Sequence, residues 1–257
     1  MKQIKCEVFE MSNSDFAIEN NVLIKYNGNC ENVVIPNTVS RIAKNAFKNC
    51  STIKSVTIPN SVTEIGECAF HACKQLERIE LPKGSIKIDS YTFTACENLL
   101  SVNLPEGLTT ISDGMFANCK NLVSVQLPDS IDTICKQAFF GCEKLKNINI
   151  SDNVISIGKG AFNDCNSLAD EDGFVIIKNV LYHYVGKKHD ITIPDNVTHI
   201  DWNAFFHYIK LSITTYSKEL PINIESFRWN VKLTVKAPAG SYAEWFAKEN
   251  NISFVAI

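Results

Sequence analysis

The stretch from Ile58 to Glu80 reads IPNSVTEIGECAFHACKQLERIE, and most of the chain repeats it at intervals of 23 residues. Three residue types recur at that interval. The prolines are Pro36, Pro59, Pro82, Pro105 and Pro128. The aromatic positions are Phe47, Phe70, Phe93, Phe116, Phe139 and Phe162. Three residues after each Phe comes a cysteine, and these are Cys50, Cys73, Cys96, Cys119, Cys142 and Cys165. A fixed period in this range is typical of a solenoid, in which each repeat forms one coil of a stack.

The second half of the repeat predicts a short strand with one buried face. Apolar and polar side chains alternate from Leu76 to Leu81, and Pro82 then ends the strand by removing a backbone donor. The spacing of three residues between Val62 and Ile65 favours tight turns or single 3-10 turns. Because one coil cannot shelter its own apolar residues, we expect ladders of Phe, Cys, Leu and Ile with a rise of roughly 4.8 Å per coil.

The pattern Cys73-x-x-Leu76-x-x-Ile79-x-Leu81-Pro82, followed by Ala-Phe, resembles the BspA-like (Treponema-type) leucine-rich repeat. The resemblance extends from about Phe16 to the C-terminus. It implies a leucine-rich repeat solenoid, a right-handed coil stack with a parallel β-sheet on one face. The family is associated with bacterial and protist surface proteins that bind host or matrix proteins. The asparagine ladder of other leucine-rich repeats is not expected here, since the corresponding positions carry Ser61, Gly84, Gly107 and Ser130.

A second unit occurs twice in the chain, at 16–36 and 174–194. Each copy alternates apolar and polar residues around a polar centre, and each predicts a hairpin that leads into a coil. The matching pairs are Phe16 and Phe174, Ile18 and Ile176, Leu23 and Leu181, Tyr26 and Tyr184, Gly28 and Gly186, and Pro36 and Pro194.

These patterns predict a single solenoid domain over 1–257. Its expected parts are an N-terminal cap and hairpin unit (1–35), a first block of repeats (36–169), a second hairpin unit (170–193), degenerate repeats (194–234) and a C-terminal α/β cap (235–257). In the degenerate part, Tyr208 and Asn230 take the cysteine position. In the cap, we expect a helix over Tyr242–Glu249 with Ser241 as its N-cap, followed by a strand over Ile252–Ile257.

The composition excludes several classes of partner. The formal net charge of −3 gives no electrostatic basis for binding nucleic acid, and no apolar stretch is long enough for membrane insertion. The first residues, MKQIKCEVFEMSNSDF, lack the apolar segment of a secretory signal. That feature and the many thiols favour the cytoplasm, whereas the family resemblance favours the cell surface, so the compartment is left open. The oligomeric state is not indicated.

No catalytic, cofactor-binding or metal-binding set is expected from the sequence. The ladder cysteines predict buried free thiols, with disulfides between neighbouring coils as the alternative. The series Cys68, His71, Cys73 does not predict convergent metal ligands, because Cys73 belongs to the buried ladder while His71 follows the ladder Phe and points elsewhere. The remaining histidines have no partner at a recognisable motif spacing, and they are His183, His189, His199 and His207. The acidic run 170–172 reads as a solvated turn.

The sheet face is the predicted functional surface. On each strand the side chains on either side of the inward residue should point outward together. These candidate protein-binding residues are Ser55, Thr57, Arg78, Glu80, Ser101, Asn103, Ser124, Gln126, Asn147 and Asn149. We therefore expect a non-enzymatic protein–protein interaction module, adhesin-like and directed at a host or matrix protein. The alternative is a structural spacer with no ligand of its own, and an enzyme is disfavoured.

Overall fold

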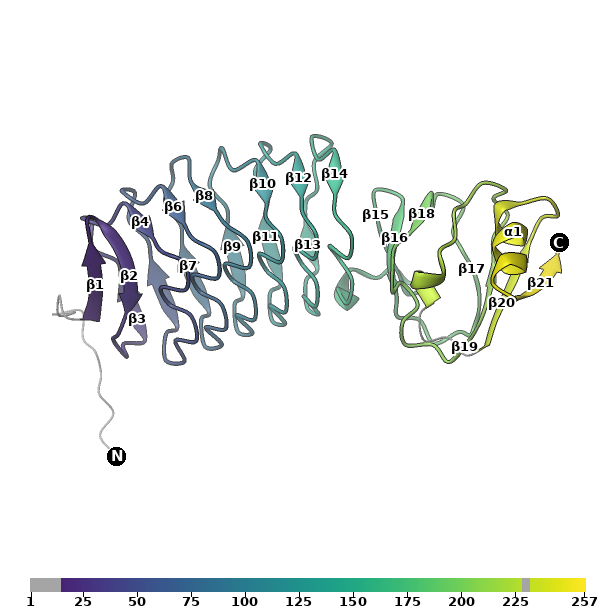
Figure 1. Cartoon of the computed structure of the whole chain (residues 1–257), viewed down its shortest axis with the longest axis horizontal. Helices are drawn as coiled ribbons and strands as arrows, with labels where there is room; N and C mark the ends of the chain where they lie inside the picture. Colours follow the sequence, from purple (N-terminus) through teal and green to yellow (C-terminus); the bar gives the residue numbers. More distant parts are fainter. Residues whose placement is uncertain (1–14, 228–231) are drawn as a thin grey trace, which may run out of the picture. The chain divides into compact units, whose positions relative to one another are not determined.

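The structure is a computed structural model that describes residues 15–227 and 232–257. The chain divides into two compact units, an N-terminal unit (Met1–Ala161) and a C-terminal unit (Phe162–Ile257), whose elements are labelled in Figure 1. Within the described ranges, no helix combines the length and apolar character that crossing a membrane requires. Asn230, which was predicted to take the cysteine position, and residues 1–14 of the predicted N-terminal cap lie outside the described residues.

Each unit contains one of the two predicted hairpins. The antiparallel pairs are β1 (Phe16–Glu19) with β2 (Val22–Tyr26), and β15 (Phe174–Ile177) with β16 (Val180–Tyr184). The turn residues Asn20, Asn21, Lys178 and Asn179 all have positive φ, as the two-residue type I′ turn of a hairpin requires. The register shifts at the same place in both copies, directly after the second residue of the first strand. The sequence duplication is therefore also a duplication of strand pairing.

The strand predicted in each repeat forms a six-stranded parallel sheet in the N-terminal unit. Its strands in spatial order are β3 (Asn32–Val34), β5 (Ser55–Thr57), β7 (Arg78–Glu80), β9 (Ser101–Asn103), β11 (Ser124–Gln126) and β13 (Asn147–Ile148). The middle residue of each three-residue strand is buried, as Val102 is, because one face covers the core. The one-sided sheet predicted from the alternating pattern is confirmed.

A second side of the coil also carries parallel strands, where the sequence predicted only tight turns. These strands form two sheets. In the first, the hairpin strands β1 and β2 are followed by β4 (Arg41–Ile42), β6 (Glu64–Ile65) and β8 (Lys87–Ile88). The second contains β10 (Thr110–Ile111), β12 (Thr133–Ile134) and β14 (Ser156–Ile157). A two-residue strand is too short to show alternation in sequence. It forms because stacked coils bring backbone groups together, as where the amide of Gly66 donates to the carbonyl of Ile42 over 2.8 Å.

The phenylalanine ladder forms the centre of the N-terminal unit. From Phe47 to Phe139 the rings are fully buried, and successive ring centroids lie 4.7, 5.6, 5.6 and 5.5 Å apart with nearly parallel planes. Tyr26 extends the ladder by stacking on Phe47 at 5.1 Å, which the sequence pattern did not show. Gly28 is required beside it, because a Cβ there would collide with the Tyr26 hydroxyl. Offset stacking of this kind adds to the free energy gained by burial alone.

Two corners of each coil lie in the left-handed region, and in the first coils both carry a non-glycine residue. In one repeat these are Asn45 and Asn49, and in the next they are Cys68 and Ala72. Each such residue costs about 1–3 kcal/mol in backbone strain. The cost is offset because the amides point to the next coil, as where Asn49 donates to the carbonyl of His71 over 2.9 Å. Cys68 therefore occupies a corner of the coil, outside the cysteine ladder.

The C-terminal unit contains a short and a longer sheet. In the first, β18 (His199–Ile200) pairs with β16 of the hairpin. The second is parallel, with the order β17 (Asp190–Thr192), β19 (Lys210–Thr214), β20 (Lys232–Ala237) and β21 (Ser253–Ala256). Among the described residues of this unit, the helical segments are two 3-10 turns, Asn166–Leu168 and Ile224–Phe227, and α1 (Tyr242–Glu249).

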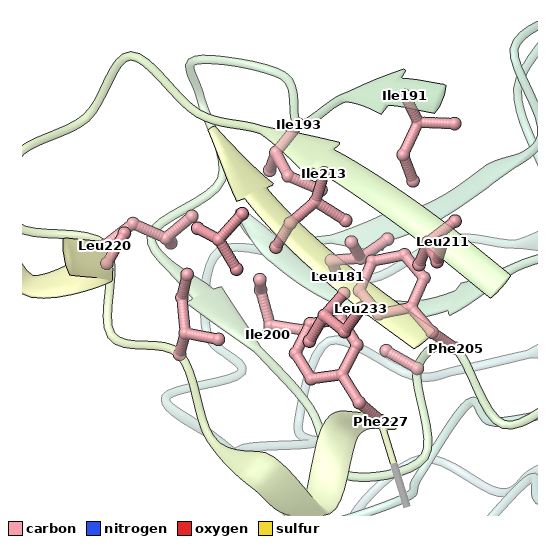
Figure 2. Packing of buried hydrophobic residues seen from close by; sticks show 14 of the residues in the cluster. Leu181, Ile191, Ile193, Ile200, Phe205, Leu211, Ile213, Leu220, Phe227 and Leu233 are labelled. Carbon is pink, nitrogen blue, oxygen red and sulfur yellow. The ribbon is translucent and has the colours of Figure 1, made fainter. Parts of the chain in front are cut away.

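The phenylalanine ladder resumes in this unit. Phe205 and Phe227 stack at 5.0 Å, among the buried aliphatic side chains shown in Figure 2. The predicted helix has the predicted bounds, and the Ser241 side chain accepts a hydrogen bond from the amide of Glu244 as its N-cap. Its buried face includes Phe246, and the strand that follows it, β21, joins the sheet. This element covers the end of the hydrophobic core.

Candidate functional site

The outward side chains of the six-stranded sheet form a continuous row, and we call the ten predicted positions the sheet strip. They are Ser55, Thr57, Arg78, Glu80, Ser101, Asn103, Ser124, Gln126, Asn147 and Asn149. All ten are exposed or half-buried, whereas the intervening Ile79 is only 5% exposed. The parallel register aligns Arg78 with Ser101, Ser101 with Ser124, and Ser124 with Asn147. Nine of the ten positions lie on the strands of this sheet, with like-placed neighbours one coil away. Asn149, which was predicted on the last strand, directly follows β13 instead.

Hydrogen bonds between coils hold part of the sheet strip. Ser55 donates to the Asn32 side chain over 2.6 Å, and Thr57 donates to the Glu80 carboxylate over 3.2 Å. Asn32, on β3, thus extends the row by one coil that the sequence reasoning omitted. The Arg78 guanidinium forms no ion pair with any described residue, so its donors face solvent. Arginine in such a position is a common anchor in protein interfaces.

Leu100 and Val123 are exposed apolar side chains that border the sheet strip, and neither was predicted from the sequence. Leu100 is 50% exposed and Val123 is 38% exposed, directly before β9 and β11. They occupy the same position in neighbouring coils, since the Val123 amide donates to the Leu100 carbonyl over 2.9 Å. The sequence could have indicated this, because the equivalent position of the two preceding repeats carries the charged residues Lys54 and Glu77, so an apolar residue there departs from the pattern. Apolar side chains beside polar ones give the mixed character of an interface centre.

Charged residues on the second side of the coil are already paired with one another. Glu64 lies 3.2 Å from Arg41 and 3.8 Å from Lys87, and Lys44 lies 2.6 Å from Glu67. These pairs join like positions of successive coils with opposite charges. Each exposed pair contributes little to stability, but its charges are partly neutralised. Glu64 on this side is therefore engaged by two cations, whereas Arg78 of the sheet strip forms no ion pair with a described residue.

The C-terminal unit has its own outward row on the longer sheet, which the sequence reasoning did not assign. Asp190 of β17 receives two bonds from the Lys236 ammonium of β20, at 2.7 and 3.0 Å. The hydrogen bonds from the Lys236 ammonium lower the pKa of the Asp190 carboxyl below its usual range. The charges of Asp190 and Lys236 are therefore paired with each other, whereas Arg78 of the sheet strip forms no ion pair with a described residue.

The cysteine ladder lies in the core. The thiols of Cys73, Cys96, Cys119 and Cys142 donate to the backbone carbonyls of Phe47, Phe70, Phe93 and Phe116, over 3.0 to 3.2 Å. Burial raises the pKa of the Cys96 thiol to about 12, so the thiol is neutral at physiological pH. The nine described cysteines are free thiols. The buried position predicted for the ladder is confirmed from Cys73 to Cys165, whereas Cys50, in the first coil, is only half-buried. The buried thiols lack the exposure that a nucleophile needs.

The structure does not bring Cys68, His71 and Cys73 together as ligands. Cys73 is fully buried and bonded to a carbonyl, while Cys68 and His71 are half-buried.

Instead, a different set converges in the C-terminal unit: Asp164, His183 and His207. One ligand atom from each lies within 4.8 Å of the other two. His183 Nε2 is 3.5 Å from Asp164 Oδ1, and His207 Nε2 is 3.8 Å from the same oxygen. Desolvation lowers the pKa of His183, although Asp164 opposes that shift. No sequence motif indicates this cluster, because its members come from separate elements.

Solved structures of known proteins share this fold. A T. pallidum leucine rich repeat protein is 28% identical, with a TM-score of 0.54 over 63% of this chain and 91% of that protein. A leucine rich cell surface protein from Faecalibacterium prausnitzii is 24% identical, with a TM-score of 0.56 over 95% of this chain and 91% of that one. A leucine-rich repeat protein from Eubacterium ventriosum is 16% identical, with a TM-score of 0.53 over 92% of this chain and 78% of that protein. No curated protein matches the sequence.

The repeats themselves decide the family. Six copies of the BspA type leucine rich repeat region match residues 17–136 and 109–234, which run from β1 to β20. Repeat proteins of this kind generally serve as scaffolds for protein interaction. The chain belongs to the family of BspA type leucine rich repeat proteins.

Proposed function

We propose that this protein is a non-enzymatic binding module that holds a protein partner against the sheet strip of the N-terminal unit. The observation that carries the proposal is the row of outward polar side chains bordered by Leu100 and Val123 and containing the unpaired Arg78. A partner that lies across several coils meets like groups at each step, so small contributions add. No cofactor enters this mode of binding.

The composition of the sheet strip favours a protein over other ligands. Ser, Thr, Asn and Gln offer both donors and acceptors, which suit the backbone and side chains of a polypeptide. The strip carries one Arg and one Glu and therefore has no charge excess that would attract a phosphate backbone. Burying Leu100 and Val123 would add the apolar contact that stabilises a protein interface.

An adhesin-like role is the finer form of the proposal, with a host or matrix protein as the partner. Two points support it. The similar protein from Faecalibacterium prausnitzii is described as a cell surface protein. The exposed residues of the strip are spread over several coils, which suits a repeated contact with an extended protein.

The test begins with a panel of purified matrix proteins immobilised on a surface, with the full chain as analyte. Arg78→Glu should weaken binding to any partner found, because it reverses the charge of the one cationic side chain in the sheet strip. Glu64→Ala on the second side of the coil is the matched control, and it should bind as the wild type does. Loss of binding in the control with normal binding by Arg78→Glu would place the site on the other side. A chain that binds nothing in the panel, or in cross-linked extract of host cells, would instead act as a structural spacer.

A further inference from the structure

We propose that Asp164, His183 and His207 form a binding site for a divalent transition-metal ion of the Zn²⁺ class in the C-terminal unit. The ligand atoms are Asp164 Oδ1, His183 Nε2 and His207 Nε2. This site is separate from the sheet strip, and it does not depend on the binding function proposed above.

The spacing of the three atoms fits coordination. Zinc binds nitrogen and oxygen ligands at about 2.0–2.2 Å in a tetrahedron, which places ligand atoms roughly 3.4 Å from one another. The distances from Asp164 Oδ1 are 3.5 Å to His183 and 3.8 Å to His207. Small side-chain rotations close the remaining gap. The same distances are too long for good hydrogen bonds, whose N–O separation is about 2.7–3.2 Å.

His183 is the observation that points to a ligand. It is 2% exposed, and its Nδ1 has no hydrogen-bond partner among the described residues. Its Nε2 faces Asp164 at the long distance given above. A buried imidazole without a hydrogen bond of normal length is costly to the fold, and an ion is one of the recognised explanations for such a residue. A neutral imidazole is also the form that binds metal.

The two hairpins provide an internal comparison. His183 of β16 corresponds to Lys25 of β2 in the duplicated unit, and Lys25 is exposed. The position corresponding to His207 is Asn49 in the first block. The hairpin and the coil that follows it therefore require neither histidine. Both histidines occur only in the copy where Asp164 is their neighbour.

The site is open on one side, so an ion can enter it. His207 has 61% of its side chain exposed and Asp164 has 34%, while the buried His183 anchors the third corner. Three protein ligands leave a tetrahedral ion one free position, for water or for a group of a bound molecule. Two imidazoles and one carboxylate favour zinc, iron, nickel or copper over calcium and magnesium, which prefer oxygen ligands.

The experiment uses the full chain, freed of metal by a chelator and kept reduced, and titrates it with Zn²⁺ in a calorimeter and with Co²⁺ in a spectrophotometer. We expect one equivalent to bind, and the Co²⁺ spectrum should show nitrogen and oxygen ligation without thiolate charge transfer. His207→Ala and Asp164→Asn should each weaken binding by more than about 100-fold, since even groups outside the ligand set change affinity by about 10–100-fold. His199→Ala is the matched control, because His199 is an exposed histidine of the same unit.

Because the His207 side chain is largely exposed, its removal should leave the fold intact, and a denaturation curve without metal checks this. With metal, the wild type should gain thermal stability and His207→Ala should not. Binding that is equally strong in all four proteins, or that shows thiolate ligation, would overturn the proposal. Absence of saturable binding to the wild type would also overturn it.

Discussion

The thiol of Cys119 donates a hydrogen bond to the backbone carbonyl oxygen of Phe93, in the preceding coil, with an Sγ–O distance of 3.1 Å. The same bond joins Cys142 to Phe116 at 3.1 Å. Cysteine suits this position because it fills an apolar space and still donates weakly to a carbonyl. The ladder therefore uses cysteine for its volume and its donor, and not for its reactivity.

Removing one ladder thiol should destabilise the fold. Cys119→Ala leaves a small cavity and removes one of two donors to the Phe93 carbonyl, which still accepts from the Cys96 amide over 3.1 Å. We expect a loss of about 1–2 kcal/mol in the free energy of unfolding. Chemical denaturation in the presence of reductant measures it. Cys135→Ala is the control, since Cys135 is half-buried and outside the ladder. Equal midpoints for Cys119→Ala and the wild type would show that the thiol does not contribute.

Stability should fall at alkaline pH because the buried thiols cannot ionise. The pKa of Cys96 is raised to about 12, against about 8.5 in an unfolded chain. Above about pH 8.5 the Cys96 thiol therefore keeps its proton in the folded state but loses it in the unfolded state, and this difference favours unfolding. Below about pH 8.5 the thiol is protonated in both states and has no effect on stability. At pH 9.5 each such thiol should cost about 1.4 kcal/mol relative to neutral pH.

The check is the free energy of unfolding at pH 7.5 and 9.5 for the wild type and for Cys96→Ala. The difference between the two pH values should be smaller in the variant, because one proton-binding group has been removed. An unchanged difference would mean that Cys96 ionises equally well in the folded state.

The middle of the phenylalanine ladder should be sensitive to truncation. Phe116 is fully buried and stacks on Phe93 and Phe139 at 5.6 and 5.5 Å. Phe116→Ala should cost about 3–5 kcal/mol, from lost burial and the cavity left behind. Denaturant titration followed by circular dichroism measures this. Phe206→Ala is a suitable comparison, since Phe206 follows a ladder residue but is 38% exposed and should cost far less. Similar costs for the two variants would contradict the ladder as the main core.

The apolar border of the sheet strip should matter for binding and not for stability. Leu100→Ser removes an exposed apolar contact, and its effect on the free energy of unfolding should stay within about 0.5 kcal/mol. Affinity for a partner of the sheet strip should fall by about 10-fold or more if Leu100 lies at the interface centre. Surface plasmon resonance and a thermal melt measure the two quantities. Ile155→Ser is the control, because Ile155 is also exposed, at 84%, but does not belong to the sheet strip.

The sequence alone determined the repeat and everything that follows from a local pattern. The positions of Phe116 and Cys119 in the core follow from their 23-residue period, because identical coils stack in register. The alternation around Ile79 determined which side chains of each strand point outward. The duplicated hairpin and the helix over Tyr242–Glu249 were also predictable, since turn residues, caps and helical spacing act over a few residues.

Only the tertiary structure decided what the coils bring together across long separations. The two-residue strands such as β6 have no alternation to detect, and they exist because hydrogen bonds form between stacked coils. The stacking of Tyr26 on Phe47 depends on how the hairpin meets the first coil. The proximity of Asp164, His183 and His207 has the same origin. Their separations in sequence match no ligand motif, because each comes from a different element, and the packing of those elements alone sets the distances between them.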